Sequence, residues 1–314
     1  MKSFKIQPNE ANQRLDRLLL KKFKKLSRTA IYMLLRKNDI KINGKRTAGD
    51  YQLQVDDVVS VYTDDKYLEI DLDISFSNAR DLTDIVYEDD HILVVKKPIG
   101  LIVHDFDGKS YDTLNNRILK YLAKKGYYNP FQSSSFTPGI VHRLDRNTTG
   151  LVLACKTALS MRVFNELFKN NQISRKYLVL TYKQLPKKDD TVYLFMEKDS
   201  KTNHMVVSDY KNKTNKTAIT EYHFKQKYKN FFMYEVSLHT GRTHQIRATL
   251  NYLGAPIVGE QYYINSNIDK NHNYEYQCLV AFSLKFGDLS KFDEQLKYLS
   301  NKEFVLDDVW FLSK

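Results

Sequence analysis

Short apolar runs bounded by turn signals limit most strongly what this chain can fold into. Candidate strands cover residues 91–97, 151–156, 176–183, 217–227 and 231–238. The first of them is stopped by Pro98 and Gly100, which do not continue a strand. The last two are separated by a short Lys-Asn connection and are therefore expected to pair as antiparallel neighbours. Strands that pair in sequence order favour an antiparallel sheet.

Only two clear helices accompany these strands. Residues 158–170 place Leu159, Val163, Phe164, Leu167 and Phe168 on one side of a helix. A second helix, at about 243–253, carries Ile246, Leu250 and Leu253 and ends before Gly254. Two helices are too few for a doubly wound sheet. The sequence therefore predicts an α+β fold, with helices flanking a largely antiparallel mixed sheet.

The first 63 residues contain a separate, compact pattern. Apolar residues at helical spacing predict two short helices, with Ser27 as N-cap of the second. Ile40 and Ile42 then alternate before the tight-turn signal Asn43-Gly44, and VDDVVSVY supplies a further strand. This ordered series resembles the alpha-L RNA-binding module of ribosomal proteins and RNA-modifying enzymes. The resemblance predicts an alpha-L-type domain over residues 1–63.

Charge is distributed unevenly around this domain. The formal net charge is +12, and residues 1–55 hold fourteen Lys and Arg against four acids. Residues 56–90 hold two bases and twelve acids, and residues 64–84 are predicted to be an acidic linker. Two basic blocks indicate two polyanion-binding units, although a solvated lysine-rich surface explains the charge equally well. The expected RNA contacts of the first block are Lys21, Lys22, Lys24, Lys25, Arg28, Arg36, Lys37, Asn43, Lys45 and Arg46.

Several classes of site are disfavoured. Cys155 and Cys278 are too few for a disulfide framework or a cysteine metal site. DGKS at 107–110 lacks the earlier glycine of a phosphate loop, because Val103 stands there. His239 and His244 lack the glutamate of a helical zinc motif and are expected to be orienting or structural. No signal peptide or membrane-length apolar run is present, and we expect a cytoplasmic protein.

The stretch GIVHRLDRNTTG, residues 139–150, places charged residues directly before the apolar run LVLACKT. It resembles the active-site signature of the RluA family of pseudouridine synthases. Three further blocks are similar to that family in the same order: YEDDHILVVKKPIGLIVH, RKYLVL and HTGRTHQIRATLNYLGAPIVGEQYY. Together with the N-terminal module, they resemble the RluC-like branch, which acts on large-subunit ribosomal RNA.

The resemblance implies an isomerisation of uridine within RNA. The bond from uracil N1 to the ribose breaks, the ring turns, and C5 bonds to the sugar; neither a metal nor a redox cofactor is implied. Asp145 matches the catalytic aspartate, which either adds to the uracil or assists a glycal-type intermediate. Arg247 matches the arginine that pairs with it. Burial disfavours an ionised carboxylate, and an opposing guanidinium favours it.

The remaining matched residues concern the substrate base. Tyr177 matches the tyrosine that packs on the base and is a candidate for removing the C5 proton. Leu279 matches a leucine that borders the base pocket. Arg143 matches the arginine that holds open the stack from which the uridine is swung out. His142 is expected to be a hydrogen-bonding support beside the substrate.

The chain departs from the family pattern at a few positions: Asn147, Thr148, Thr149, Ala248, Thr249, Glu260, Ile264 and Val280. None of them removes Asp145, Tyr177 or Arg247.

The sequence thus predicts an RNA pseudouridine synthase that modifies uridines of 23S large-subunit ribosomal RNA, with a catalytic domain over residues 85–314. Its expected partner is this RNA or a ribosome assembly particle, and we expect a monomer without a membrane or an obligatory protein partner. One alternative is a tRNA-directed or multi-site synthase of the same family. Another is a non-catalytic RNA-binding or ribosome-assembly protein.

Overall fold

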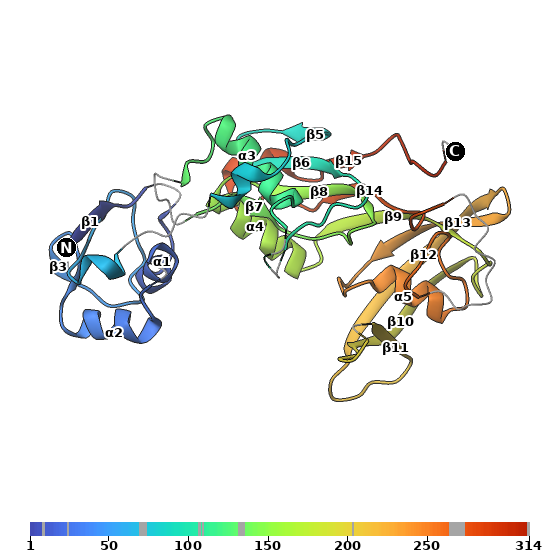
Figure 1. Cartoon of the computed structure of the whole chain (residues 1–314), viewed down its shortest axis with the longest axis horizontal. Coiled ribbons are helices and arrows are strands. Elements are labelled where there is room, and N and C mark those ends of the chain that lie inside the picture. Colours follow the sequence, from blue (N-terminus) through green and yellow to red (C-terminus); the bar gives the residue numbers. More distant parts are fainter. Residues whose placement is uncertain are drawn as a thin grey trace.

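The computed structural model describes residues 1–7, 10–23, 25–68, 74–105, 108, 110–130, 136–202, 204–263 and 274–312. Its strands form two separate sheets, one from each end of the sequence (Figure 1). The smaller sheet has the order β1-β4-β2-β3, in which every pair is antiparallel. Its strands are β1 (Lys2–Lys5), β2 (Ile40–Ile42), β3 (Lys45–Arg46) and β4 (Val58–Val61).

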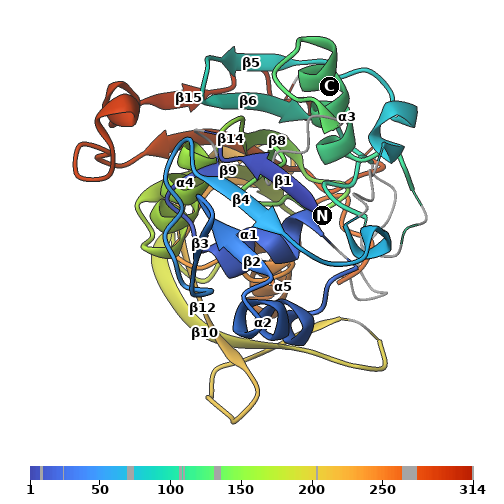
Figure 2. The ribbon, with the colours of Figure 1, turned by 90° about the vertical axis from the view of Figure 1, so that its left-hand side faces the viewer.

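The N-terminal helices agree with the predicted pattern. They are α1 (Leu15–Lys22) and α2 (Arg28–Arg36), and the hydroxyl of Ser27 accepts a hydrogen bond from the amide of Ala30. Their apolar faces pack on the small sheet, which lies at the front of the view in Figure 2. Strand β1 was not predicted, because KSFK is too short and too basic to look like a strand without its partner β4.

The predicted linker 64–84 divides into two parts with different neighbours. Leu68, which follows the 3-10 helix η2 (Asp65–Tyr67), is buried in the N-terminal core. In the second part, η3 (Ser75–Asn78) packs against α3 (Leu114–Lys124), and the ring of Phe76 lies 5.7 Å from that of Tyr128. The second part is thus attached to the C-terminal unit.

The large sheet has eleven strands, with the order β11-β10-β12-β13-β9-β14-β8-β6-β5 and with β15 and β7 added beside β14 and β8. Only the pair β14–β8 is parallel among the described strands. This architecture confirms the predicted mixed, largely antiparallel sheet. The strands are β5 (Ile85–Glu88), β6 (Ile92–Lys97), β7 (Gly139–Ile140), β8 (Thr149–Cys155), β9 (Ile173–Thr181), β10 (Asp189–Lys198), β11 (Met205–Ser208), β12 (Lys216–Tyr228), β13 (Phe231–Leu238), β14 (Leu279–Phe286) and β15 (Glu303–Val305).

Helices α4 (Ala158–Lys169) and α5 (Gln245–Tyr252) lie where the sequence predicts them. The expectation of only two clear helices was wrong, because α3 is a third, capped by the hydroxyl of Thr113. A short 3-10 helix, η5 (Glu294–Leu299), lies near the C-terminus. None of the helices in the described ranges is long and apolar enough to cross a membrane.

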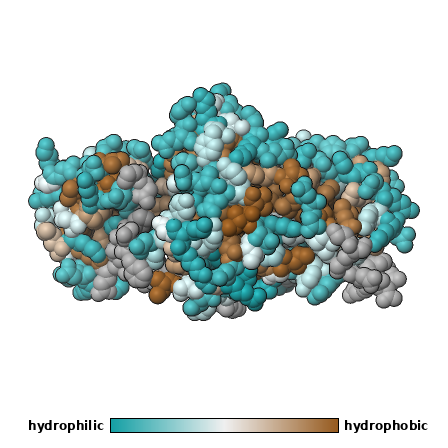
Figure 3. All heavy atoms as spheres, turned by 90° about the horizontal axis from the view of Figure 1, so that it is seen from above, coloured by the Kyte–Doolittle hydropathy of each residue, from teal (hydrophilic) through white to brown (hydrophobic). Residues whose placement is uncertain are grey.

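Strands β6 and β8 contain the continuous apolar runs Ile92–Val95 and Leu151–Cys155 because both faces of the sheet are covered there. Leu93 and Val152 face the core that contains α3, whereas Ile92 and Leu151 face the core that contains α4. Figure 1 shows the two helices on opposite sides of these strands. The outer surface is mostly hydrophilic, with an apolar band visible from above (Figure 3).

Gly150 lies where β8 meets β14 and has a φ of 129°. A Cβ at this position would lie 2.6 Å from the amide nitrogen of Ala281 and closer still to its carbonyl oxygen. We expect Gly150→Ala to lower the free energy of unfolding by about 3 kcal/mol or more, because it combines a backbone clash with a strained φ. Chemical denaturation measures this change.

Gly126→Ala is the matched control. Gly126 also has a positive φ, 81°, but an added Cβ would meet nothing within 4 Å. Its expected cost is about 1–2 kcal/mol, from the left-handed backbone alone. Equal losses of stability in the two variants would contradict the close approach of β8 and β14.

Candidate active site

Asp145 lies on the loop between β7 and β8, and this loop is tied down on both sides. The carbonyl of Asp145 accepts a hydrogen bond from the amide of Thr148 at 3.1 Å. The hydroxyl of Thr148 accepts a bond from Gln277 at 2.9 Å, and the hydroxyl of Thr149 donates to the carbonyl of Lys97. The loop that bears the Asp145 carboxylate is therefore held by residues at or next to the ends of β6 and β14.

Lys97 anchors the same loop from beneath. Its ammonium is fully buried and donates to the carbonyl oxygens of Pro98, Leu101 and Arg146 at 2.7–2.8 Å. Burial lowers the pKa of Lys97 to about 7, while the nearby charge of Asp145 opposes this shift. The three N–H donors of the Lys97 ammonium match these three carbonyl acceptors in number. The bonds connect the end of β6 to Arg146, the residue that follows Asp145.

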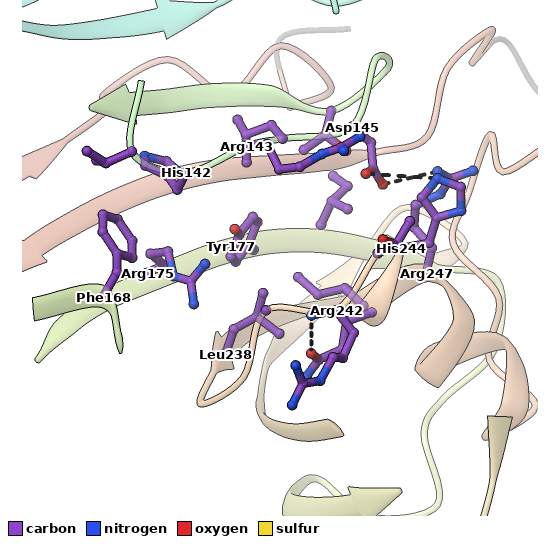
Figure 4. A pocket seen from close by; sticks show the side chains of 18 of the residues that line it. His142, Arg143, Asp145, Phe168, Arg175, Tyr177, Leu238, Arg242, His244 and Arg247 are labelled. Carbon is purple, nitrogen blue, oxygen red and sulfur yellow. Dashed lines mark hydrogen bonds and ion pairs between the residues drawn. The ribbon is translucent and has the colours of Figure 1, made fainter. Parts of the chain in front are cut away.

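Arg247 meets Asp145 across the site, as the sequence predicted. Its Nη1 donates to Oδ2 of Asp145 at 3.1 Å, and the two residues are 102 positions apart in the chain. The arginine side chain is only 9% exposed and that of Asp145 is 19% exposed. Helix α5 projects Arg247 toward the loop of Asp145 (Figure 4).

Glu260 holds the other edge of the same guanidinium. It accepts from Nε and Nη2 of Arg247 at 2.7 and 2.8 Å, a bidentate pair. Burial alone would raise the pKa of Glu260, but the bonds from Arg247 hold it below its usual value. In the sequence, Glu260 stands out only as a departure from the family pattern. No sequence signal places it opposite Arg247, because the contact depends on how the chain turns after α5.

His244 is the N-cap of α5 and adopts a left-handed conformation with a φ of 53°. Its Nδ1 is hydrogen-bonded to the hydroxyl of Tyr263 at 2.8 Å, and its Nε2 lies 3.9 Å from Oδ1 of Asp145. Burial lowers the pKa of His244, against the attraction of Asp145. The expected orienting role is consistent with this position beside the carboxylate.

A cavity of about 470 Å³ opens beside Asp145 (Figure 4). All six residues predicted for catalysis or base binding line it: His142, Arg143, Asp145, Tyr177, Arg247 and Leu279. Tyr177 and Leu279 are 4% and 3% exposed and supply apolar walls. Burial raises the pKa of Tyr177, which disfavours the phenolate that removal of a C5 proton would require.

His142 and Arg143 are neighbours with different surroundings. The imidazole Nε2 of His142 accepts a hydrogen bond from the amide of Leu153 at 3.0 Å, and its ring lies 5.0 Å from that of Phe168. Burial, reinforced by the charge of Arg175, lowers the pKa of His142 to about 3. His142 is therefore neutral and braces β8, whereas Arg143 is exposed at the cavity.

The predicted RNA contacts of the N-terminal unit fall into three groups. Seven of the side chains are exposed: Lys21, Lys25, Arg28, Arg36, Lys37, Lys45 and Arg46. Lys22 requires a correction, because its ammonium is buried, pairs with Glu10 at 3.3 Å and lies 4.3 Å from the ring centre of Phe4. Asn43 is exposed, but its side chain bonds Asp57 and Val58 and shapes the turn. Lys24 and Ile264 lie outside the described residues.

Replacing Glu260 tests the electrostatic support of Arg247. We expect Glu260→Gln to lower the free energy of unfolding at pH 7 by about 3–5 kcal/mol, because it removes a charge from a buried pair. Since the folded-state pKa of Glu260 is depressed, the wild-type protein loses this contribution as the pH falls below the ordinary value of 4.5. Urea unfolding at pH 7 and pH 4 should therefore show a smaller gap at the lower pH.

The exposed Glu294 provides the control. Its carboxylate is 81% exposed and pairs with Lys297 at 3.2 Å. Glu294→Gln should change stability by no more than about 0.5 kcal/mol. A similarly small change for Glu260→Gln at pH 7 would contradict the role assigned to the buried pair.

Comparisons with known proteins show the family to which the chain belongs. The profile of the family described as RNA pseudouridylate synthase matches residues 91–252. An uncharacterized RNA pseudouridine synthase of Mycoplasma capricolum is 34% identical over 313 residues, with 99% of each chain covered. A ribosomal large subunit pseudouridine synthase C of Buchnera aphidicola (subsp. Baizongia pistaciae) is 32% identical, covering 90% of this chain and 88% of its own length.

A solved structure, Human RNA Pseudouridylate Synthase Domain Containing 4, is similar in fold. It has 21% sequence identity and a TM-score of 0.56, and covers 73% of this chain and 90% of its own. The family match spans more than half of the sequence and includes the loop of Asp145 and helix α5. The chain therefore belongs to the RNA pseudouridylate synthase family, whose members isomerise uridine in RNA, as the sequence resemblance predicted.

Proposed function

We propose that this pseudouridine synthase modifies large-subunit ribosomal RNA and that Asp145 is its catalytic residue. The ion pair of Asp145 with Arg247 at a cavity lined by Tyr177 and Leu279 is the observation that carries the proposal. Relatives named ribosomal large subunit pseudouridine synthase C and D, at 32% and 30% identity, support the choice of RNA. The bacterial ribosome is cytoplasmic, and we place the enzyme there.

The chemistry needs a charged carboxylate and a confined base. Nη1 of Arg247 donates to the carboxylate of Asp145, and Glu260 occupies the other edge of the guanidinium. The carboxylate then either adds to the uracil ring or assists departure of the base from C1′ through a glycal-type intermediate. In both routes the detached ring turns between Tyr177 and Leu279 and rejoins the sugar through C5. C5 then loses its proton and the freed N1 takes one up, so the composition of the nucleotide is unchanged.

Access to the base requires that the uridine leave its stack, at a cost of a few kcal/mol. Arg143 is two residues from Asp145, is exposed and lines the same cavity. We assign it to the RNA around the displaced nucleotide. RNA binding energy, part of it from the exposed cations of the N-terminal unit, offsets the unstacking.

Asp145→Asn is expected to abolish pseudouridine formation while leaving RNA affinity within about threefold, since the amide keeps the shape and loses the charge. Tritium release from in vitro transcribed large-subunit rRNA labelled at uridine C5 measures the reaction, and filter binding measures affinity. Asp209→Asn, at an exposed position, is the control and should retain full activity.

The outcomes separate the alternatives. Turnover of the rRNA by Asp145→Asn would reject the catalytic assignment. Wild-type activity on tRNA with none on rRNA would favour a tRNA-directed synthase. A deletion strain that keeps every pseudouridine in its RNA would favour a non-catalytic protein.

The N-terminal unit is tested by its charge. Arg28, Arg36 and Lys37 are exposed at the two ends of α2. Changing all three to Gln should weaken rRNA binding and lower the slope of log affinity against log salt by about 0.7–0.9 for each phosphate that these side chains neutralise. The triple change Lys285→Gln, Lys291→Gln and Lys297→Gln, also exposed, is the matched control. Equal salt slopes for the two triple variants would contradict RNA binding by α2.

A further inference from the structure

The cavity continues past Tyr177 to an end that the isomerisation does not use. This end is lined by Phe168 and Lys169 of α4, by Arg175 of β9, and by Gly241 and Arg242 of the turn before α5. Figure 4 shows Phe168 and Arg175 on one side of Tyr177 and the pair of Asp145 with Arg247 on the other. One continuous hollow thus joins the catalytic carboxylate to a group of basic side chains.

Arg175 projects into the cavity for a simple reason of strand geometry. It is two residues before Tyr177 on β9, so both side chains lie on the same face, about 7 Å apart along the strand. The guanidinium carbon lies 5.4 Å from the ring centre of Phe168. Gly241 stands opposite, where an added Cβ would be 3.6 Å from Nη1 of Arg175. The guanidinium of Arg175 therefore lies between the ring of Phe168 and the backbone of Gly241, which has no side chain.

The positive charge at this end has no matching negative charge in the described part of the chain. Among those residues, Lys169, Arg175 and Arg242 form no ion pair with a carboxylate. Nε of Arg175 is buried and has no hydrogen-bond partner there, and Nε of Arg242 donates to the carbonyl of Thr217 at 2.8 Å. A partly buried cation without an anion is costly, and contact with Phe168 offsets only part of the cost. Such a group favours the binding of an anion.

We propose that this end of the cavity is a phosphate subsite, in which Arg175, assisted by Lys169 and Arg242, binds an RNA phosphodiester next to the everted uridine. The inference rests on the proposed function, because it places the uridine beside Asp145, between Tyr177 and Leu279. Binding the backbone on one side of the everted nucleotide would add affinity for the RNA in the ground state and the transition state alike. Arg175 is on this view a substrate-binding residue that does not touch the reacting atoms.

The test is steady-state kinetics of Arg175→Gln with the C5-tritiated large-subunit rRNA. We expect KM to rise about tenfold and kcat to stay within about twofold, because a phosphate contact is made equally in the ground and transition states. The slope of log affinity against log salt should fall by about 0.7, the value for one phosphate of a single strand. Arg175→Lys should restore the salt slope and part of the affinity, since it keeps the charge.

Two further variants guard against a folding defect. Lys169 is exposed, so Lys169→Gln should fold normally and shift KM and the salt slope in the same direction. Arg162→Gln is the matched control, because Arg162 is exposed on the same helix but does not line the cavity. Thermal melts followed by circular dichroism establish that each variant is folded.

The results discriminate between the subsite and the proposed function. Unchanged KM and salt slope in both Arg175→Gln and Lys169→Gln would overturn the subsite while wild-type turnover upheld the enzyme. A lower kcat with unchanged KM would also overturn it, because Arg175 would then act through Tyr177. Absence of wild-type turnover would reject the rRNA proposal instead, and the salt slopes of binding would still decide whether Arg175 contacts phosphate.

Discussion

The buried guanidinium of Arg247, shared between two carboxylates, is the interaction on which the site depends. Glu260 occupies two donors of its planar fork, so the remaining edge can only be directed at Asp145. A single arginine facing Asp145 from a flexible position would attract it without defining its direction. The two hydrogen bonds to Glu260 fix the orientation of the Arg247 side chain, which lines the cavity. Glu260 therefore fixes the direction from which Arg247 meets Asp145.

The scaffold supplies equal rigidity on the side of Asp145. Strand β8 is buried on both faces, and Gly150 lets it approach β14 closely enough for the parallel pairing that follows the active-site loop. The ammonium of Lys97 is buried and donates hydrogen bonds to backbone carbonyls, including that of Arg146. Burying the ammonium of Lys97 costs solvation free energy, and its hydrogen bonds to the carbonyls offset this cost. These bonds form only when the loop has the conformation seen here. Loop position and strand packing are thus coupled.

Basic side chains differ across the molecule in how deeply they are buried. Exposed cations lie on the N-terminal unit, where we propose that they attract the RNA polyanion. Cations held by neighbours, such as Arg175 on Phe168, line the cavity. Lys22 belongs to neither group, because helix α1 turns it inward toward Glu10. A count of basic residues cannot separate these three cases, and burial does.

The sequence by itself determined the fold class, about half of the strands, the helices α1, α2, α4 and α5, and the residues around Asp145. These features are local: periodic apolar residues, Ser27 as a cap, Asn43-Gly44 as a turn, and the charged stretch before β8. Helix α3 was not predicted, and the same is true of strands β1, β5, β10, β11, β14 and β15, because their patterns are weak without partners. Only the tertiary structure decided that Glu260 faces Arg247, that Lys22 is buried, and that Arg175 shares a cavity with Asp145. Those facts join residues far apart in the chain, and contact between distant side chains follows from packing in three dimensions, which no local pattern contains.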